Sequence, residues 1–246
     1  MKPLSQILAL YAGYLREVQD RPLPVQAMVL TSGVHGPALG PIESLAINAF
    51  LVGIAFFLLC RPTVSPRREI LVLSSITIAA AASRVLLEPI PNVQPLTVMC
   101  LVMGATLGAR RGIAFAVMAT LLSNMVLSNG WWTLFQASGW AAVAFAGSRL
   151  PLIVDSTVQM KQLLFAAVGA SLLFDWWVSL SIWTSGMSIG EFGLYLMNGL
   201  PFDALHILAS LTAAVWIAPW LSNLLHEEVT FEQEPVATGE ADVVTG

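Results

Sequence analysis

The sequence predicts an all-α integral membrane protein, and two properties of its composition carry that prediction. Of its 246 residues, 57% are hydrophobic and only 11% are charged, with a mean hydropathy of +0.77, whereas about 25% of an ordinary globular chain is charged. The hydrophobic residues also gather in runs of roughly 20, the length of helix that crosses a bilayer. We therefore expect membrane-spanning helices rather than a soluble domain.

Charged residues and prolines mark where the first spans end. The first run covers residues 42–60 and stops at Arg61, and the polar segment 1–41 that precedes it is not hydrophobic enough to cross a bilayer. The second run covers residues 69–88, and the three prolines between residues 89 and 95 disfavour any continuation of the helix. Two separate spans are expected here.

The third apolar run, residues 96–127, is too long for one crossing. As a single helix it would be roughly 48 Å long at 1.5 Å per residue, and Arg110 and Arg111 would lie at its centre. A cation at the bilayer centre costs about 2.5–3.5 kcal/mol. We therefore expect a hairpin of two short spans that turns at residues 108–112, where Gly104, Gly108 and Gly112 stand four residues apart and allow close helix packing.

Three further runs, 134–153, 162–184 and 192–225, bring the expected number of spans to seven. Lys and Arg gather in every second loop, and the loops 89–95, 128–133 and 185–191 contain neither. By the positive-inside rule the basic loops are cytoplasmic. The basic residues are Arg61, Arg67, Arg68, Arg110, Arg111, Arg149 and Lys161. The topology of residues 1–60 stays open, because the 42–60 span is either an accessory to a six-span core or part of a more complicated arrangement.

The formal charge of −4 arises from the end of the chain. Six of the fifteen acidic residues lie after residue 226, without any Lys or Arg among them, so residues 226–246 are expected to form an acidic, disordered cytoplasmic tail. Nothing in this charge distribution suggests nucleic-acid binding. Cys60 and Cys100 show no metal-ligand spacing, so neither a metal site nor a cofactor is expected.

Polar and aromatic residues in the outer half of the predicted spans are the candidate ligand-binding groups, because an intramembrane polar group suggests function by default. Asn198, Phe202 and His206 share one face of the last helix at four-residue spacing. The candidate site residues are Asn92, Gln94, Asn129, Trp132, Gln136, Trp140, Asp175, Asn198, Asp203 and His206. A buried Asp/His pair that merely ties helices together is the alternative, and Arg84 and Glu88 could neutralise each other.

Tryptophans form a second pattern. Six of the eight fall between Trp131 and Trp183, and many are explained by interfacial belts. Trp140, Trp176 and Trp177 lie deeper than a belt requires. They predict either an aromatic wall for a bulky ligand or ordinary core packing.

Several of these segments together resemble a known family. A glycine-rich helical hairpin follows an extended entry with Pro91 and Pro95, then comes a loop reading Trp132-Thr-Leu-Phe-Gln136, and a late helix reads Gly199-Leu-Pro-Phe-Asp203-x-x-His206. In order and spacing they are similar to the substrate-binding S components of energy-coupling factor (ECF) vitamin transporters. The resemblance covers roughly residues 69–225.

This resemblance implies a six-helix S-component-like core at residues 69–225 plus one extra N-terminal transmembrane helix at 42–60. It implies a multi-pass plasma-membrane protein that captures a vitamin from outside, while a transmembrane T component and two cytoplasmic ATPases supply the energy. Docking in the family uses a small-residue face, which here matches Ser75, Ala79 and Ser83, although two of these are serine where the family usually carries alanine. The Trp-rich, sparsely charged cavity favours a macrocyclic vitamin such as cobalamin, since a strongly anionic substrate would need more basic groups than Arg84.

Two other classes of function remain as alternatives. A proton-coupled secondary transporter could use Asp175, Asp203 and His206 as a relay, although the spans show no inverted repeat of the kind expected in many such carriers. A membrane-embedded enzyme could use Asp203 and His206 as acid and base. Because the sequence has no Walker A, GxSxG or HExxH motif, we expect no catalytic residues and no enzyme.

Overall fold

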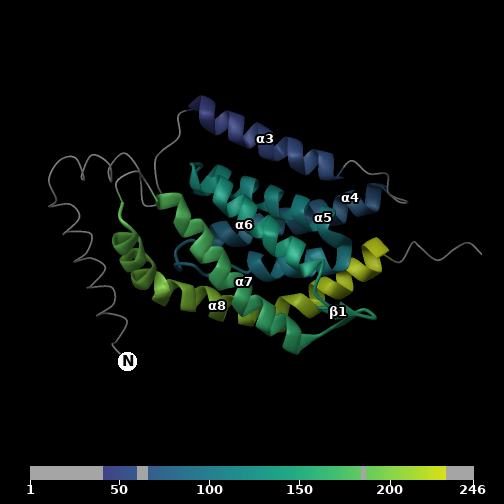
Figure 1. The fold of residues 1–246 in the computed structure, drawn as a ribbon. Helices are drawn as coiled ribbons and strands as arrows, with labels where there is room; N and C mark the ends of the chain where they lie inside the picture. The colour runs from purple at the N-terminus through teal and green to yellow at the C-terminus, as the bar shows by residue number, and fades with distance from the viewer. Residues whose placement is uncertain (1–40, 60–65, 184–186, 231–246) are drawn as a thin grey trace, which may run out of the picture.

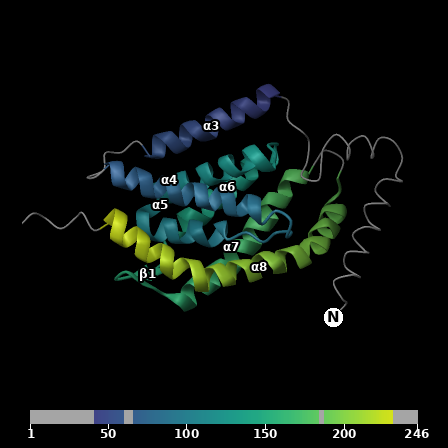
Figure 2. The ribbon, with the colours of Figure 1, turned by 180° about the vertical axis from the view of Figure 1, so that it is seen from behind.

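A computed structural model describes residues 41–59, 66–183 and 187–230. The expectations for residues 1–40, and for the tail beyond residue 230, lie outside the described residues. The α-helices pack side by side along a common direction (Figures 1 and 2). They are α3 (Pro41–Leu59), α4 (Pro66–Leu86), α5 (Leu96–Leu127), α6 (Trp132–Gly147), α7 (Met160–Ser179) and α8 (Ile189–Leu225). Shorter elements are the strands β1 (Ile153–Val154) and β2 (Thr157–Val158), the 3-10 helix η1 (Leu180–Ile182) and the π-helical turn η2 (His226–Thr230).

The chain is all-α in its main elements and has the helices of a membrane protein. Within the described residues, four segments are long and apolar enough to cross a bilayer: Arg68–Leu86, Leu96–Leu127, Met160–Ile182 and Ile189–Val229. Helix α3 has 19 residues and α6 has 16 residues. These lengths support a membrane-spanning chain, and the number of seven spans stays a prediction.

The hairpin expected in residues 96–127 is confirmed. Within α5, Gly108 has φ 81° and ψ 168°, which breaks the helix into two arms, and a positive φ of this kind suits glycine because it has no Cβ. The arms return alongside each other, since a Cβ on Gly112 would lie 2.8 Å from the Cα of Gly104. The turn carries Arg110 and Arg111 to an end of the bundle instead of its middle.

Glycines also bring α5 against α6. A Cβ on Gly104 would lie 1.9 Å from the Ala144 carbonyl oxygen, and one on Gly147 would lie 2.3 Å from the Leu101 oxygen. Only glycine permits such backbone approach. The expected packing role of Gly104 and Gly112 is therefore confirmed, while Gly108 makes the turn.

The segment around α6 differs from the sequence-based prediction in two ways. Residues 132–136, expected as a loop, form the first turns of α6, and the helix ends at Gly147 instead of continuing to residue 153. After Pro151 the chain turns through β1 and β2, where Asp155 and Ser156 adopt positive φ values of 47° and 62°. This turn needs left-handed backbone, which an apolar run does not reveal.

The last helix, α8, begins at a capping box. The Ser188 side chain accepts a hydrogen bond from the Glu191 amide, and the Glu191 carboxylate accepts one from the Ser188 amide. Pro201 and Pro219 lie inside the helix, which bends along the bundle in Figure 1. The expected tail starts later than residue 226, because residues 226–230 still form the helical turn η2.

The basic loops lie at one end of the bundle. Arg68 at the start of α4 pairs with Glu228 of η2, and Arg111 at the α5 turn pairs with Glu69 at 2.9 Å. The Ser156 hydroxyl reaches the ring of His226 at 3.0 Å. We name this the basic end, and it fits the alternation of charges in the loops.

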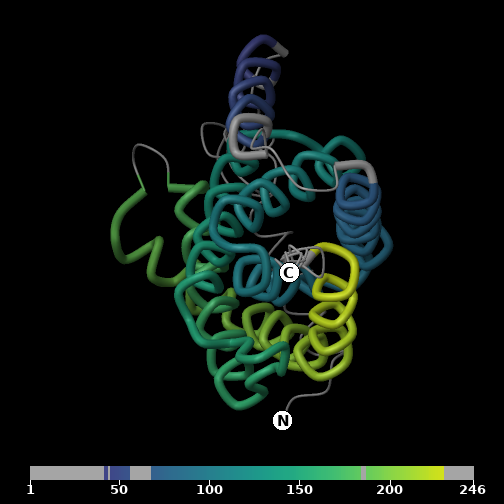
Figure 3. Tube along the Cα trace, turned by 90° about the vertical axis from the view of Figure 1, so that its right-hand side faces the viewer, coloured from purple at the N-terminus to yellow at the C-terminus, as the bar shows by residue number. Residues whose placement is uncertain are grey.

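The core is built mainly by α5, α6, α7 and α8. Fully buried side chains such as Leu96, Leu101, Trp140, Leu163 and Leu221 form one cluster. A smaller cluster joins Leu51 and Ala55 of α3 to α5 and α6. Viewed along the helices, α3 stands at the periphery (Figure 3).

Candidate functional site

A continuous network of polar side chains lies inside the bundle at the end opposite the basic end. Its members come from α4, the α4–α5 connection, both arms of α5, and α6, α7 and α8. They are Arg84, Asn92, Gln94, Thr97, Ser123, Asn124, Thr133, Gln136, Trp140, Asp175 and His206. We call this set the polar network.

Arg84 lies on α4 and is the buried cation of the network, with 5% of its surface exposed. Its Nε donates to Gln94 Oε1 at 3.2 Å, and its Nη1 donates to Asn124 Oδ1 at 3.2 Å and to Ser123 Oγ. The guanidinium carbon also lies 4.5 Å from the centre of the Trp140 ring, a cation–π distance. All these partners are neutral.

The expected neutralisation of Arg84 by Glu88 is wrong. Helix α4 ends at Leu86, so Glu88 is not one helical turn along the same face, and its side chain is exposed. None of the ion pairs in the described part of the chain includes Arg84.

A second line of contacts crosses the bundle from α7 to α6. Asp175 Oδ1 lies 2.9 Å from His206 Nδ1, and His206 Nε2 lies 2.7 Å from the hydroxyl of Thr97. The Trp140 indole N–H donates to the same hydroxyl at 3.1 Å. All three bonds are satisfied when the Thr97 hydroxyl donates to His206 and the His206 Nδ1–H donates to Asp175. A buried Asp/His pair is therefore present, as the alternative interpretation expected, but it is part of a larger network.

Two amides of the α4–α5 connection join the cation to the carboxylate. The Asn92 amide donates to Asp175 Oδ2 at 3.1 Å and to the Phe202 carbonyl at 3.2 Å, and Gln94 donates to Asn92 Oδ1 at 3.4 Å. Asn92 holds a left-handed φ of 59°, which asparagine tolerates better than most residues. Arg84 and Asp175 are thus connected through Gln94 and Asn92.

Asn124 ties α5 to the start of α6. Its amide donates to Thr133 Oγ1 at 3.1 Å and to Gln136 Oε1 at 2.9 Å, while its oxygen accepts from Arg84. In the connection before α6, Asn129 has a buried Oδ1 that meets no hydrogen-bond partner among the described residues. An acceptor of this kind is costly to bury alone.

Aromatic rings fill the space beside the network. Trp140 is fully buried and stacks on Phe174 with ring centres 4.2 Å apart, and Phe174 meets the His206 ring edge-on at 5.7 Å. Trp176 and Trp177 are 46% and 44% exposed. Of the three deep tryptophans that the sequence singled out, Trp140 alone lies in the interior.

A comparison with protein families adds one finding to this geometry. The sequence profile of DUF6580, a family of unknown function, matches residues 64–228. The chain belongs to the DUF6580 family. No curated protein and no solved structure matches the chain.

The segment that matches DUF6580 runs from just before α4 to η2, and α3 lies outside it. Every member of the polar network falls inside the matched segment. The network therefore belongs to the part of the chain that defines the family match.

Most residues that the sequence selected as candidates meet in this DUF6580 segment. Asn92, Gln94, Gln136, Trp140, Asp175 and His206 are all members of the network. Asp203 is buried but accepts from Trp176 at 3.2 Å. Trp132 is half-buried at the start of α6, Asn129 is half-buried in the connection before it, and Asn198 is exposed on α8.

Several network residues were not among the predicted site residues. Arg84 was expected to pair locally with Glu88, Thr97 was not singled out, and Thr133 was noted only as part of the segment 132–136. Ser123 and Asn124 were detectable as an adjacent polar pair within an apolar run.

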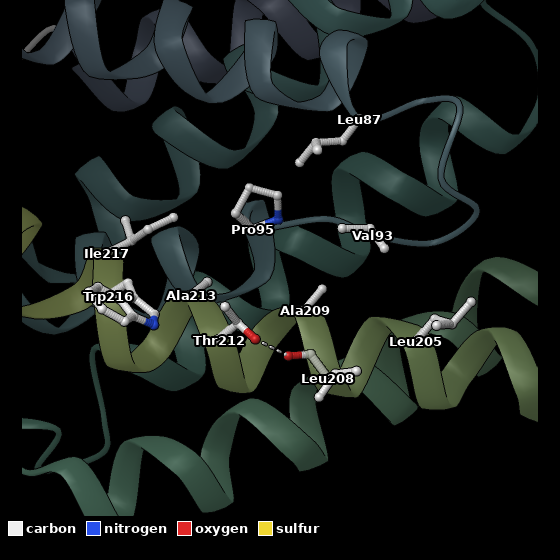
Figure 4. Close-up of a pocket in the computed structure, with 10 residues that line it drawn as sticks. All are labelled: Leu87, Val93, Pro95, Leu205, Leu208, Ala209, Thr212, Ala213, Trp216 and Ile217. Atoms are coloured by element: carbon white, nitrogen blue, oxygen red, sulfur yellow. Dashed lines mark hydrogen bonds between the residues drawn. The ribbon is translucent and has the colours of Figure 1, made fainter.

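Two apolar grooves separate α8 from α4 and its connection. One, of about 390 Å³, lies between the α4–α5 connection and the middle of α8, with Val93, Pro95, Leu208 and Trp216 among its walls (Figure 4). The other, of about 500 Å³, lies nearer the basic end, between α4 and the end of α8. Ser75 and Ala79 line this second groove, whereas Ser83 is half-buried and donates to the Ala80 carbonyl at 2.7 Å.

Proposed function

We propose that this DUF6580 protein is the membrane-embedded substrate-binding subunit of an ATP-driven ECF-type importer. It sits in the plasma membrane as a multi-pass protein and captures a vitamin or related micronutrient from outside. The observation that carries the proposal is the polar network, which gathers a buried guanidinium, a carboxylate, an imidazole and four side-chain amides in a membrane protein. Buried polar groups of this kind are costly in lipid and mark functional sites.

The chemistry of these groups favours binding over catalysis. Amides, hydroxyls and a guanidinium recognise a ligand by hydrogen bonds, and the buried Trp140–Phe174 pair offers an apolar wall next to them. An enzyme would need a nucleophile or a metal ligand set as well, and the sequence motifs offer neither. On the aromatic content alone, the ligand class favoured by the sequence is a large vitamin such as cobalamin.

The proposal assigns the energy to partner proteins. Ser75 and Ala79 are exposed on α4 in the groove beside the end of α8, and small side chains allow a partner helix to approach closely. This face is proposed to dock a T component, which connects the subunit to two cytoplasmic ATPases. Ser83 contributes less, because it is half-buried.

A proton-coupled secondary transporter is the second candidate, and the Asp175–His206 contact favours it. A carboxylate 2.9 Å from an imidazole can pass a proton. The third member of the expected relay, Asp203, is hydrogen-bonded to Trp176 instead.

Native mass spectrometry of the detergent-purified protein tests the binding function directly. We expect a bound small molecule, and we expect Asn92→Ala to lose it, because Asn92 contacts both Asp175 and α8 in the network. The matched control is Asn223→Ala, an exposed position near the end of α8. Equal ligand occupancy in both variants would place the site elsewhere.

Vesicle transport separates the two candidates. The purified protein alone, with an imposed proton gradient, should bind the identified ligand without accumulating it, and ATP-dependent uptake should require the partner proteins. Accumulation on the gradient alone, abolished by Asp175→Asn, would establish the carrier and refute the importer subunit.

A further inference from the structure

We infer that the ligand of the polar network is a monocarboxylic acid, which Arg84 binds in the position now held by the Gln94 side-chain oxygen. The inference rests on the proposed binding function and adds the class of ligand and the residue that selects it.

Arg84 is a buried charge without an ionic partner among the described residues. Its hydrogen-bond acceptors are the neutral oxygens of Gln94, Ser123 and Asn124. The nearest acid along the network is Asp175, three hydrogen bonds away through Gln94 and Asn92, and its two oxygens are already used by His206 and Asn92. A buried cation is stabilised far more by a carboxylate than by amides.

The guanidinium has the geometry to bind a carboxylate. The planar guanidinium can donate two parallel hydrogen bonds to the two oxygens of a carboxylate. The Trp140 ring lies against the face of the guanidinium and therefore does not block the N–H groups, which point outward in its plane. One guanidinium balances one negative charge, which favours a single acid group over a phosphate ester or a polyacid. Because the network is closely hydrogen-bonded, a small acid fits the site better than a macrocycle.

Gln94 is the acceptor most easily displaced from Arg84. Ser123 and Asn124 are held in the second arm of α5, whereas Gln94 lies in the connection between α4 and α5. The bonds from Arg84 to Gln94 and to Asn124 are equally long, at 3.2 Å. The Gln94 amide is otherwise held by a long bond of 3.4 Å to Asn92, whereas the Asn124 amide donates at 3.1 and 2.9 Å to two residues of α6. A ligand carboxylate that replaces Gln94 Oε1 exchanges a neutral acceptor for an ionic one and keeps the other contacts of Arg84.

Matched acid and amide probes test this inference with the full-length protein in detergent. The probes are nicotinic acid and nicotinamide, biotin and biotinamide, lipoic acid and lipoamide, and pantothenic acid and pantothenol, each measured by the shift in thermal unfolding and by equilibrium binding. We expect at least one acid to bind and its neutral partner to bind at least about 30-fold more weakly, the ratio that corresponds to about 2 kcal/mol for a buried charge pair.

Three variants assign the effect to Arg84. Arg84→Gln should lose acid binding by the same factor of about 30 or more, and Arg149→Gln should not, although Arg149 also lies over an aromatic ring, 4.9 Å from that of Phe145. Gln94→Ala should tighten acid binding by about fivefold, because it removes one competing neutral hydrogen bond worth roughly 1 kcal/mol. If Arg84→Gln does not fold, Gln94→Ala decides, and weaker acid binding in that variant would overturn the inference.

The outcomes distinguish this inference from the proposed function. Equal binding of an acid and its amide, or acid binding retained in Arg84→Gln, would overturn the acid inference and leave a binding subunit. If no probe binds and mass spectrometry finds no small molecule on the purified protein, both the inference and the proposed function fail.

Discussion

The contact of α5 with α6 predicts a large effect for Gly104→Ala. The added Cβ would lie 1.9 Å from the Ala144 oxygen, 2.8 Å from the Ala144 carbonyl carbon and 3.1 Å from the Ser148 nitrogen. These are backbone atoms, which cannot rotate away, and favourable non-bonded contacts need roughly 3.5 Å. The two helices must therefore separate by about 1 Å or more. Substitutions that overpack a protein core in this way typically lower the free energy of unfolding by about 1–3 kcal/mol.

Gly169→Ala is the matched control, because nothing lies within 4 Å of a Cβ at that position in α7. Alanine there should stabilise the helix by up to about 1 kcal/mol, so the difference between the two variants isolates the steric cost. At about 2–4 °C per kcal/mol for a chain of this size, we expect Gly104→Ala to unfold roughly 2–12 °C below Gly169→Ala. The assay is tryptophan fluorescence of the detergent-purified proteins during heating.

The same separation should reach the polar network. Thr97 lies on the first arm of α5, and Trp140 lies on α6, and the 3.1 Å bond between them crosses the widened contact. Gly104→Ala should therefore also weaken ligand binding. Equal melting temperatures for Gly104→Ala and Gly169→Ala would refute the close packing of α5 on α6.

Three further predictions concern the network, the basic end and the orientation. Thr97→Val should lower the melting temperature by several degrees, while Thr97→Ser should not. The Thr97 hydroxyl is hydrogen-bonded to two buried ring nitrogens, and each group left unsatisfied costs about 1–3 kcal/mol. An unchanged melting temperature for Thr97→Val would contradict these hydrogen bonds. Glu228→Gln removes a partly exposed ion pair with Arg68 and should lower the melting temperature only slightly, because solvent screens exposed pairs. The small loss should disappear in 1 M salt, and a large loss that persists in salt would contradict this prediction. In a cysteine-free background, a membrane-impermeant thiol reagent added outside should label Ser188→Cys and not Ser156→Cys, and labelling of both would reject the orientation.

Local features of the sequence predicted several elements. Arg110 and Arg111 inside a long apolar run, flanked by glycines, predicted the α5 hairpin, because two cations cannot remain at the bilayer centre. The prolines between residues 89 and 95 predicted the end of α4. In contrast, the short β1–β2 hairpin after α6 depends on left-handed backbone at Asp155 and Ser156, and hydropathy does not report backbone conformation.

The sequence predicted several residues of the candidate site, but it did not predict which of them contact each other. Asn92, Gln136, Trp140, Asp175 and His206 were selected because polar and aromatic groups inside apolar spans are costly without a role. Their partners were not predictable. Glu88 was the natural partner of Arg84 by spacing, yet α4 ends before it, and the partners come from Gln94 and from the far arm of α5.

By itself, the sequence determined that this chain forms apolar helices, where the hairpin turns and which end collects the basic residues. These properties depend on residues that are neighbours in the sequence, so local hydropathy, prolines and charged residues are enough to predict them. Only the tertiary structure decided which side chains form contacts with each other. Arg84 bonds to Ser123, 39 residues away, and Asn92 bonds to Asp175, 83 residues away. Such pairs depend on the rotation of each helix about its axis and on the glycine contacts that set the distance between helices, and neither is encoded in a single segment.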